Sequence, residues 1–352
     1  MLGSRAKNAF AYRPMKVLIV KIGSIGDVVM ALPMISAVRS LDPKAPITWL
    51  CGQGVAPILE AVSDIDELLI VNERRLFLGT ARERISELSR IWYRLLGRRF
   101  DLVVSGNRDF RYRLLTLTAL ARQRRSFGDR RGRPRFIPGR YRGDEHVRLV
   151  TDQDGPRTQR FDFPQVRREL PAQLALRLEN LPRPAVALAP GGAKNFLRED
   201  SLRRWPLESY VLLARQLLER GSSVVLTGAS SDQWASSAFD HLGVVNLIGE
   251  TSVPDLLALY DQCEAVVTHD SGPLHVAVLA GTRLVALFGP TNPSEFLPPS
   301  RKIRALWTGN QLACSPCYDG KNYAPCEDNV CMRSISVEAV LKALDELLDA
   351  QA

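Results

Sequence analysis

The chain has 352 residues, of which 45% are hydrophobic and 24% charged, a composition that excludes a disordered chain and leaves room for two domains. No apolar run approaches the roughly 18 residues of a membrane-spanning helix. Residues 1–15 also lack the apolar segment of a signal peptide, so we expect a cytoplasmic protein. The formal net charge of +9 favours an anionic partner.

Arginines are concentrated between residues 122 and 142, where a single acid, Asp129, accompanies them. This arginine-rich segment is either a solvated loop or a contact for an anionic membrane surface or a phosphorylated acceptor. Nucleic acid fits less well, because the chain has no helix-turn-helix, RNP or zinc-finger pattern. The nine arginines are Arg122, Arg124, Arg125, Arg130, Arg131, Arg133, Arg135, Arg140 and Arg142.

Short apolar segments alternate with longer helical patterns along the chain, which is typical of parallel sheets with crossover helices. The first series has predicted strands at 16–20, 47–51, 67–71 and 101–105, and helices over 28–41 and 80–98. After prolines near residue 180, a second series has predicted strands at 185–190, 223–228, 244–249, 265–270 and 283–289, and helices over 207–220, 231–241, 253–262 and 273–281. We therefore expect an α/β fold of two doubly wound, Rossmann-like domains, residues 1–180 and 181–352, facing each other across a cleft.

The motif KIGSIGD at residues 21–27 directly follows the first predicted strand. Gly23 and Gly26 permit a tight turn, and a helix that starts there favours an anion at its N-terminus. The dinucleotide fingerprint G-x-G-x-x-G is not met, because Lys21 stands where that pattern needs glycine. Asp27 is either an N-cap of the helix or a carboxylate that takes a proton from a ligand.

A second turn, APGG at residues 189–192, ends the first strand of the second series. Gly191 and Gly192 would expose backbone N–H groups to phosphate oxygens. Arg203 and Arg204 follow after a polar loop and suit contacts to a diphosphate. The alternative is a surface loop with solvated charges.

A third turn, THDSGPLHVA at residues 268–277, leads from a strand into a helix. Asp270 and Ser271 end the strand, Gly272 forms the turn, and a proline suits the first helical turn. The N-terminus of that helix is again a candidate phosphate site, with His275 in its first turn. The alternative for His275 is a purely structural role.

The cysteines form one cluster in sequence and two isolated residues. The spacing C-x₂-C-x₈-C-x₄-C could bind a structural zinc ion tetrahedrally, or the thiols are free or redox-paired. A catalytic role is not expected, because the loop contains no histidine. The cluster is Cys314, Cys317, Cys326 and Cys331, and the isolated residues Cys51 and Cys263 fit buried free thiols.

In their order and spacing, these turns resemble the ADP-heptose:lipopolysaccharide heptosyltransferase family, glycosyltransferase family 9. The likeness spans nearly the whole chain and rests on KVLIVKIGSIGDVVMALP, PGG, RRWP, THDSGPLHVAVLAG and LFGPTNP. The resemblance implies the GT-B fold, an inverting mechanism and no metal or cofactor in catalysis. It also implies a nucleotide-sugar donor similar to ADP-heptose, and an anionic glycolipid or glycan acceptor presented at the inner face of the membrane.

The resemblance assigns roles to individual residues. Asp27 matches the carboxylate that deprotonates the acceptor hydroxyl, and Arg203 stands where most members have the lysine that binds the donor diphosphate. On the acceptor side we place Gly23, Ser24, Gly26, Asn107 and Arg108, and the arginine-rich segment lies where members bind their acceptor. On the donor side we place Gly191, Gly192, Arg203, Arg204, Asp270, Ser271, Gly272 and His275.

Two other classes of function remain alternatives at this point. A non-catalytic protein that binds nucleotide sugars or glycans would keep the donor turns but would not need Asp27. A nucleotide-dependent oxidoreductase would need the intact glycine fingerprint, which Lys21 interrupts.

Overall fold

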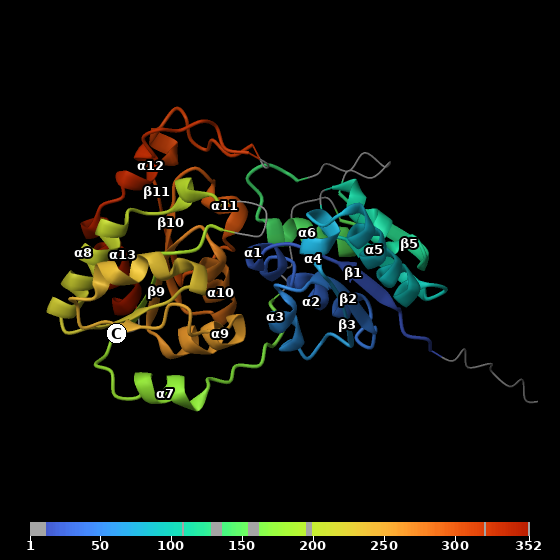
Figure 1. Ribbon diagram of the computed structural model, residues 1–352, viewed down its shortest axis with the longest axis horizontal. Helices are drawn as coiled ribbons and strands as arrows, with labels where there is room; N and C mark the ends of the chain where they lie inside the picture. Colours follow the sequence, from blue (N-terminus) through green and yellow to red (C-terminus); the bar gives the residue numbers. More distant parts are fainter. Residues whose placement is uncertain are drawn as a thin grey trace, which may run out of the picture.

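The computed structural model describes residues 12–107, 109–127, 136–153, 162–194, 199–319 and 322–350. These residues form two parallel sheets, one of five and one of six strands, each covered by helices. The two sheets and their helices lie side by side, and the chain passes once from the first half to the second (Figure 1). The predicted α/β class is therefore confirmed.

The first sheet has the strand order β3-β2-β1-β4-β5. Its central strand β1 is a run of β-branched and leucine side chains that are all buried, as expected for a strand covered on both faces. The strands are β1 (Val17–Val20), β2 (Ile47–Gly52), β3 (Glu67–Val71), β4 (Arg99–Ser105) and β5 (Leu120–Ser126). The helical elements are α1 (Ile25–Val29), α2 (Pro33–Leu41), α3 (Ala56–Glu60), α4 (Glu73–Phe77), α5 (Ala81–Leu95), the 3₁₀ helix η1 (Phe110–Thr116) and α6 (Arg142–Thr151). The next helix, α7 (Ala172–Leu178), lies beside the second half, where Arg177 donates to the Asn246 carbonyl (Figure 1).

The second sheet has the order β11-β10-β9-β6-β7-β8. Its strands are β6 (Ala185–Ala189), β7 (Ser223–Leu226), β8 (Val245–Asn246), β9 (Ala265–His269), β10 (Arg283–Phe288) and β11 (Ile303–Trp307). Its helical elements are η2 (Ser201–Arg203), α8 (Leu207–Glu219), η3 (Ser230–Phe239), α9 (Val253–Gln262), α10 (Gly272–Ala280), α11 (Pro293–Phe296), η4 (Gly309–Gln311), α12 (Val330–Arg333) and α13 (Val337–Asp349).

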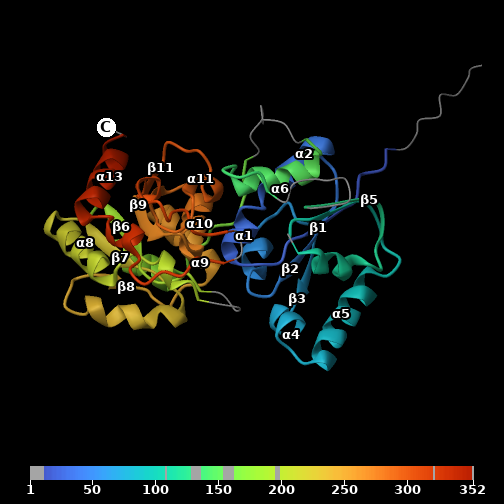
Figure 2. The same cartoon turned by 90° about the horizontal axis from the view of Figure 1, so that it is seen from above.

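The strand orders fix where ligands can bind. The order of the first sheet reverses between β1 and β4, and that of the second between β6 and β9. Open α/β sheets bind ligands beyond the carboxyl ends of the strands at such points. The helices that follow β1 and β9 are α1 and α10, and they lie against each other where the two halves meet (Figures 1 and 2).

Several predicted elements differ from the observed ones. The single helix predicted over residues 28–41 is two helices, because Pro33 cannot continue α1 and instead starts α2. The segment predicted as a helix at 231–241 is the 3₁₀ helix η3, and the strand predicted at 244–249 is only the two-residue β8. Two edge strands, β5 and β11, were not predicted from the sequence.

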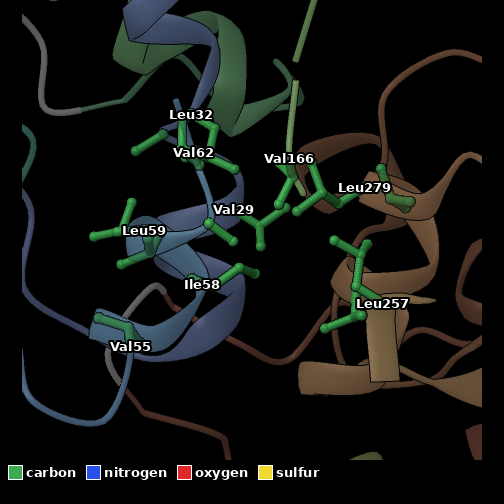
Figure 3. Close-up of a cluster of buried hydrophobic side chains, with 14 of the residues drawn as sticks. Val29, Leu32, Val55, Ile58, Leu59, Val62, Val166, Leu257 and Leu279 are labelled. Atoms are coloured by element: carbon green, nitrogen blue, oxygen red, sulfur yellow. The ribbon is translucent and has the colours of Figure 1, made fainter. Parts of the chain in front are cut away.

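An apolar contact joins the two halves beside the cleft. Val29 of α1 and Ile58 of α3 lie in one buried cluster with Leu257 of α9 and Leu279 of α10 (Figure 3). Val166, in the segment between the halves, forms an antiparallel bridge with Val62 in the same cluster. The burial of these side chains holds α1 and α10 in close contact.

Among the described residues, no helix combines the length and the apolar character that a membrane crossing requires.

Candidate active site

A cavity of about 540 Å³ lies between the two halves. Side chains that follow the strands of both sheets line it, including the turns before α1 and α10. Polar and apolar groups both contribute to the wall, as is usual where a small molecule binds. The predicted site residues that line the cavity are Gly23, Ser24, Gly26, Asp27, Arg203, Asp270, Ser271, Gly272 and His275.

Asp27 contributes a partly exposed carboxylate to this cavity. It is not the N-cap of α1, since Ser24 occupies that position and Asp27 lies in the first helical turn. Its Oδ1 accepts a hydrogen bond from Lys21 Nζ at 3.0 Å, and its Oδ2 accepts one from Ser24 Oγ at 3.1 Å. The Asp27 side chain remains 46% exposed, so a ligand in the cavity can still reach it.

The surroundings of Asp27 favour its ionised form. Burial disfavours the charge, but the Lys21 ammonium outweighs this effect through its charge and its hydrogen bond. His146 and Arg142 on α6 act in the same direction as Lys21. The pKa of Asp27 is therefore held well below that of an ordinary aspartate, and the group is a carboxylate at neutral pH.

The helices α1 and α10 approach each other through Gly26. A Cβ atom at this position would lie 2.4 Å from Cδ2 of His275, so only glycine fits there. His275 is buried, and burial lowers its pKa to about 4 even though Asp270 and Asp27 act in the opposite direction. The imidazole is therefore neutral at pH 7, and the described residues give its buried Nδ1 no hydrogen-bond partner.

The N-terminus of α10 faces the cavity with its backbone N–H groups uncapped by a side chain. Ser271 is the N-cap residue, but its hydroxyl donates to the carbonyl of His269 at 3.1 Å instead of capping the helix. Asp270 is buried and accepts a hydrogen bond from the Thr291 hydroxyl at 2.8 Å. The first turn of this helix is thus suited to an anion.

Arg203 brings a positive charge to the same side of the cavity. One guanidinium nitrogen lies 3.2 Å from a carboxylate oxygen of Asp200, and another lies 3.6 Å from Asp270. Burial opposes the charge of Arg203, yet these carboxylates and the nearby Tyr323 raise its pKa. Arg203 is therefore a fixed cation, held next to the N-terminus of α10.

The turn at Gly191 and Gly192 does not line the cavity. The N–H of Gly192 donates to Asp232 at 2.9 Å, so the prediction that this turn exposes its N–H groups is wrong for Gly192. Arg204 also makes contacts within the protein, donating to the Gly192 carbonyl at 2.7 Å and forming an ion pair with Glu199 at 2.6 Å. The polar groups of Asp232 and Arg204 are thus engaged within the protein, and neither residue lines the cavity.

The two predicted residues after β4 have separate outcomes. Asn107 does not line the cavity; its amide exchanges two hydrogen bonds with the backbone of Ile22 and so ties the end of β4 to the end of β1. Arg108 lies outside the described residues.

Other residues of the cavity were missed by the sequence analysis. Gln53 and Gly54 follow β2, and residues 72–74 follow β3. The rule that ligands bind beyond the ends of parallel strands could have found both segments. Tyr318 and Tyr323 come from the cysteine-containing loop, with ring centroids 4.8 Å apart, and no local pattern marked them.

The described part of the arginine-rich segment is largely occupied by contacts within the protein. Arg124 and Arg125 donate to backbone carbonyls of the first half. Arg142 lines the cavity and forms an ion pair with Glu295 of α11 at 3.0 Å, across the junction of the two halves. Its guanidinium lies 4.5 Å from the ring centroid of Phe296. Four of the nine arginines, Arg130, Arg131, Arg133 and Arg135, lie outside the described residues.

Of the two alternatives for the clustered cysteines, the structural zinc site receives no support. In the described parts of the chain, no three His, Cys, Asp or Glu side chains gather closely enough to hold a metal ion. Of the four clustered cysteines, Cys331 is buried, Cys317 is half-buried, and Cys314 and Cys326 are exposed. All six cysteines of the chain are free, and Cys51 and Cys263 are buried as predicted.

The model of glycosyltransferase family 9 (heptosyltransferase) matches residues 89–326. Lipopolysaccharide heptosyltransferase 2 of Escherichia coli strain K12 is 27% identical over 322 residues, which are 83% of this chain and 88% of that protein. The structure of the E. coli ADP-heptose lipopolysaccharide heptosyltransferase II is similar, with a TM-score of 0.70, 24% identity, and coverage of 96% of this chain and 100% of that one. An E. coli heptosyltransferase with ADP-2-deoxy-2-fluoro heptose is similar too, with a TM-score of 0.67, 18% identity, and coverage of 94% and 99%.

These structural likenesses confirm the GT-B fold expected from the sequence. The family match covers well over half of the chain and includes the donor-side turns predicted from the sequence. The chain therefore belongs to glycosyltransferase family 9, the heptosyltransferase family, and is a glycosyltransferase.

Proposed function

We propose that the protein transfers a heptose-like sugar from a nucleotide-sugar donor similar to ADP-heptose to a hydroxyl group of a lipopolysaccharide-type acceptor, with inversion at the anomeric carbon. The relatives support this choice of substrates, since one is a lipopolysaccharide heptosyltransferase and another holds an ADP-heptose analogue. The observation that carries the proposal is the placement of Asp27 opposite Arg203 and the N-terminus of α10 in one cavity.

The donor would bind with its diphosphate at the N-terminus of α10 and at Arg203. Both groups stabilise the negative charge that grows on the diphosphate as the bond to the sugar breaks. His275, neutral at pH 7, would lie next to that charge without adding to it. This arrangement assists departure of the leaving group without a metal ion at the sugar.

The acceptor would bind on the side of α1. Its hydroxyl oxygen attacks the anomeric carbon, the bond from that carbon to the phosphate oxygen breaks with its electron pair going to the nucleoside diphosphate, and the hydroxyl proton passes to Asp27. Holding both substrates in this geometry supplies a large part of the rate enhancement. Residues 1–180 would thus form the acceptor-side domain and residues 181–352 the donor-side domain.

We further propose that the protein touches an anionic membrane surface that carries the acceptor. Exposed apolar side chains support this contact, and they lie where the end of α5 meets η1 and the start of β5. Two hydrogen bonds hold these segments together. The Trp92 indole donates to the Leu114 carbonyl of η1, and the Gly97 N–H donates to the carbonyl of Thr118, shortly before β5. Arg94, Arg99 and Arg122 are exposed around them, and such cations attract anionic lipids. The apolar side chains are Tyr93, Leu96, Leu114, Leu117 and Leu120.

The proposal is tested by incubating the purified protein with a panel of nucleotide sugars and with a lipopolysaccharide core acceptor in vesicles. Transfer is expected from ADP-heptose, with inverted configuration in the product by NMR. Vesicles with anionic lipid should support faster transfer than neutral vesicles, while a delipidated acceptor in solution should show no such difference. Transfer from another nucleotide sugar alone would refute the donor assignment, and equal rates in both vesicles would refute the membrane contact.

A further inference from the structure

Lys21 is a buried cation that is paired with Asp27, a residue of the cavity wall. It follows β1, at the position where a dinucleotide fingerprint would have glycine, and it is only 4% exposed. Its ammonium donates to Asp27 Oδ1 at 3.0 Å and to the carbonyl of Gly106 at 3.2 Å. A buried ammonium is unfavourable unless it is paired, so the pairing with Asp27 accounts for its place in the fold.

Asp27 has charged and titratable neighbours from several elements. Arg142 and His146 on α6, His275 on α10 and Tyr112 on η1 all act on it or are acted on by it. Lys21 differs from these neighbours because its ammonium donates a hydrogen bond directly to the Asp27 carboxylate. Lys21 and Ser24 each hold one oxygen of the carboxylate, and the side chain remains partly exposed to the cavity.

We propose that Lys21 is a positioning residue that keeps Asp27 ionised and aimed at the acceptor hydroxyl, so that Asp27 acts as a weak base late in the transfer. This inference rests on the proposed role of Asp27. A weak base suffices if the oxygen first bonds to the anomeric carbon, because the positively charged oxygen is then far more acidic than a free hydroxyl. The bond to the phosphate oxygen breaks with its electron pair leaving on the diphosphate, and the proton passes to Asp27.

The test is the pH dependence of kcat in Lys21→Met, with Lys21→Arg as the conservative variant. In Lys21→Met we expect kcat to fall at least about tenfold, with the donor KM nearly unchanged. The acid limb of the kcat profile should move upward by about one to three pH units, the shift that an opposite charge usually produces in a carboxyl pKa. Lys21→Arg should keep the limb near its wild-type position.

Lys16→Met is the matched control. Lys16 immediately precedes β1, whereas Lys21 immediately follows it, and Lys16 is exposed, so its replacement should leave both kcat and the acid limb unchanged. Thermal unfolding and binding of the nucleoside diphosphate show whether each variant is folded.

His146 requires a second control, because Lys21 also lowers its pKa. If the limb stays raised in the double variant Lys21→Met/His146→Gln, it belongs to Asp27, as the proposal requires. If the double variant returns the limb to its wild-type position, or if Lys21→Met loses activity with an unmoved limb, the proposal is overturned. Asp27→Asn is measured in parallel, so that a failure of the role proposed for Lys21 can be told apart from a failure of the proposed function. Full activity in Asp27→Asn would remove Asp27 itself from the mechanism.

Discussion

The beginning of α1 in the first half and the beginning of α10 in the second follow the same plan, a central strand, a short turn and a helix whose start faces the cavity. Each carries an aspartate, but the two carboxylates have different surroundings. Asp270 is nearly fully buried and is held by Thr291 and Arg203. Asp27 is about half exposed in the cavity, although each of its oxygens accepts one hydrogen bond.

This difference indicates a division of labour between the halves. A carboxylate that is buried among its protein partners, as Asp270 is, organises the site, because little of its surface is left for a ligand. A carboxylate that is partly exposed to the cavity, as Asp27 is, can accept a further hydrogen bond from a substrate. The same local architecture therefore supplies a structural acid on the donor side and a candidate base on the acceptor side.

Exchanging each carboxylate for an amide tests this comparison most strongly. Asp27→Asn should lower kcat at least about 100-fold, the lower end of what a general base contributes, while donor affinity is kept. Asp270→Asn should mainly raise the donor KM, because it weakens the hold on Arg203. Steady-state kinetics for both substrates separate the two effects. An Asp27→Asn enzyme within about tenfold of wild type, or 1.4 kcal/mol, would show that Asp27 is not the base.

The two adjacent arginines of the donor side should differ in the same way. Arg203→Ala should weaken binding of the nucleoside diphosphate by about 1.5–3 kcal/mol, the scale of a hydrogen bond to a charged group. Arg204→Ala should have a smaller effect, because Arg204 contacts Gly192 and Glu199 and does not line the cavity. Calorimetry with ADP measures both. The reverse order of losses would move the diphosphate contact to Arg204.

The contact between the two helix starts is tested by Gly26→Ala. The new Cβ would collide with the buried ring of His275, so we expect a loss of about 1–3 kcal/mol in the free energy of unfolding, the usual cost of overpacking. Gly243→Ala is the control, since a Cβ there meets no atom within 4 Å. Urea denaturation of both variants measures the difference. Equal stability of the two would mean that α1 and α10 move apart at little cost.

The strands could be predicted from the sequence where they are buried on both faces, since such strands are continuous apolar runs. The edge strand β5 was missed because its sequence, LARQRRS, is mostly polar, and an edge strand exposed to solvent needs no apolar run. The other missed edge strand, β11, is at most half-buried along its length. Pro33 was present in the sequence as a helix-breaking signal, but the apolar pattern of residues 28–41 concealed it.

Within the candidate site, the sequence identified the turns after β1 and β9, because glycine and polar residues after a buried strand are local signals. It did not show that the Gly192 N–H is taken by Asp232, which lies 40 residues further along the chain. Nor did it show that Tyr318 and Arg142, from distant segments, complete the cavity wall.

The sequence by itself determined the alternation of strands and helices, the three turns at the strand ends and the family of the chain. Those features depend on side-chain periodicity and on the conformational preferences of neighbouring residues, which are properties of short segments. The tertiary structure decided which of the polar groups in those turns remain available to a ligand. A ligand can use only those groups that the fold leaves accessible, and accessibility depends on elements that are distant in sequence. Asp27 keeps about half of its side chain exposed although Lys21 and Ser24 hold its oxygens, whereas Asp270 is buried.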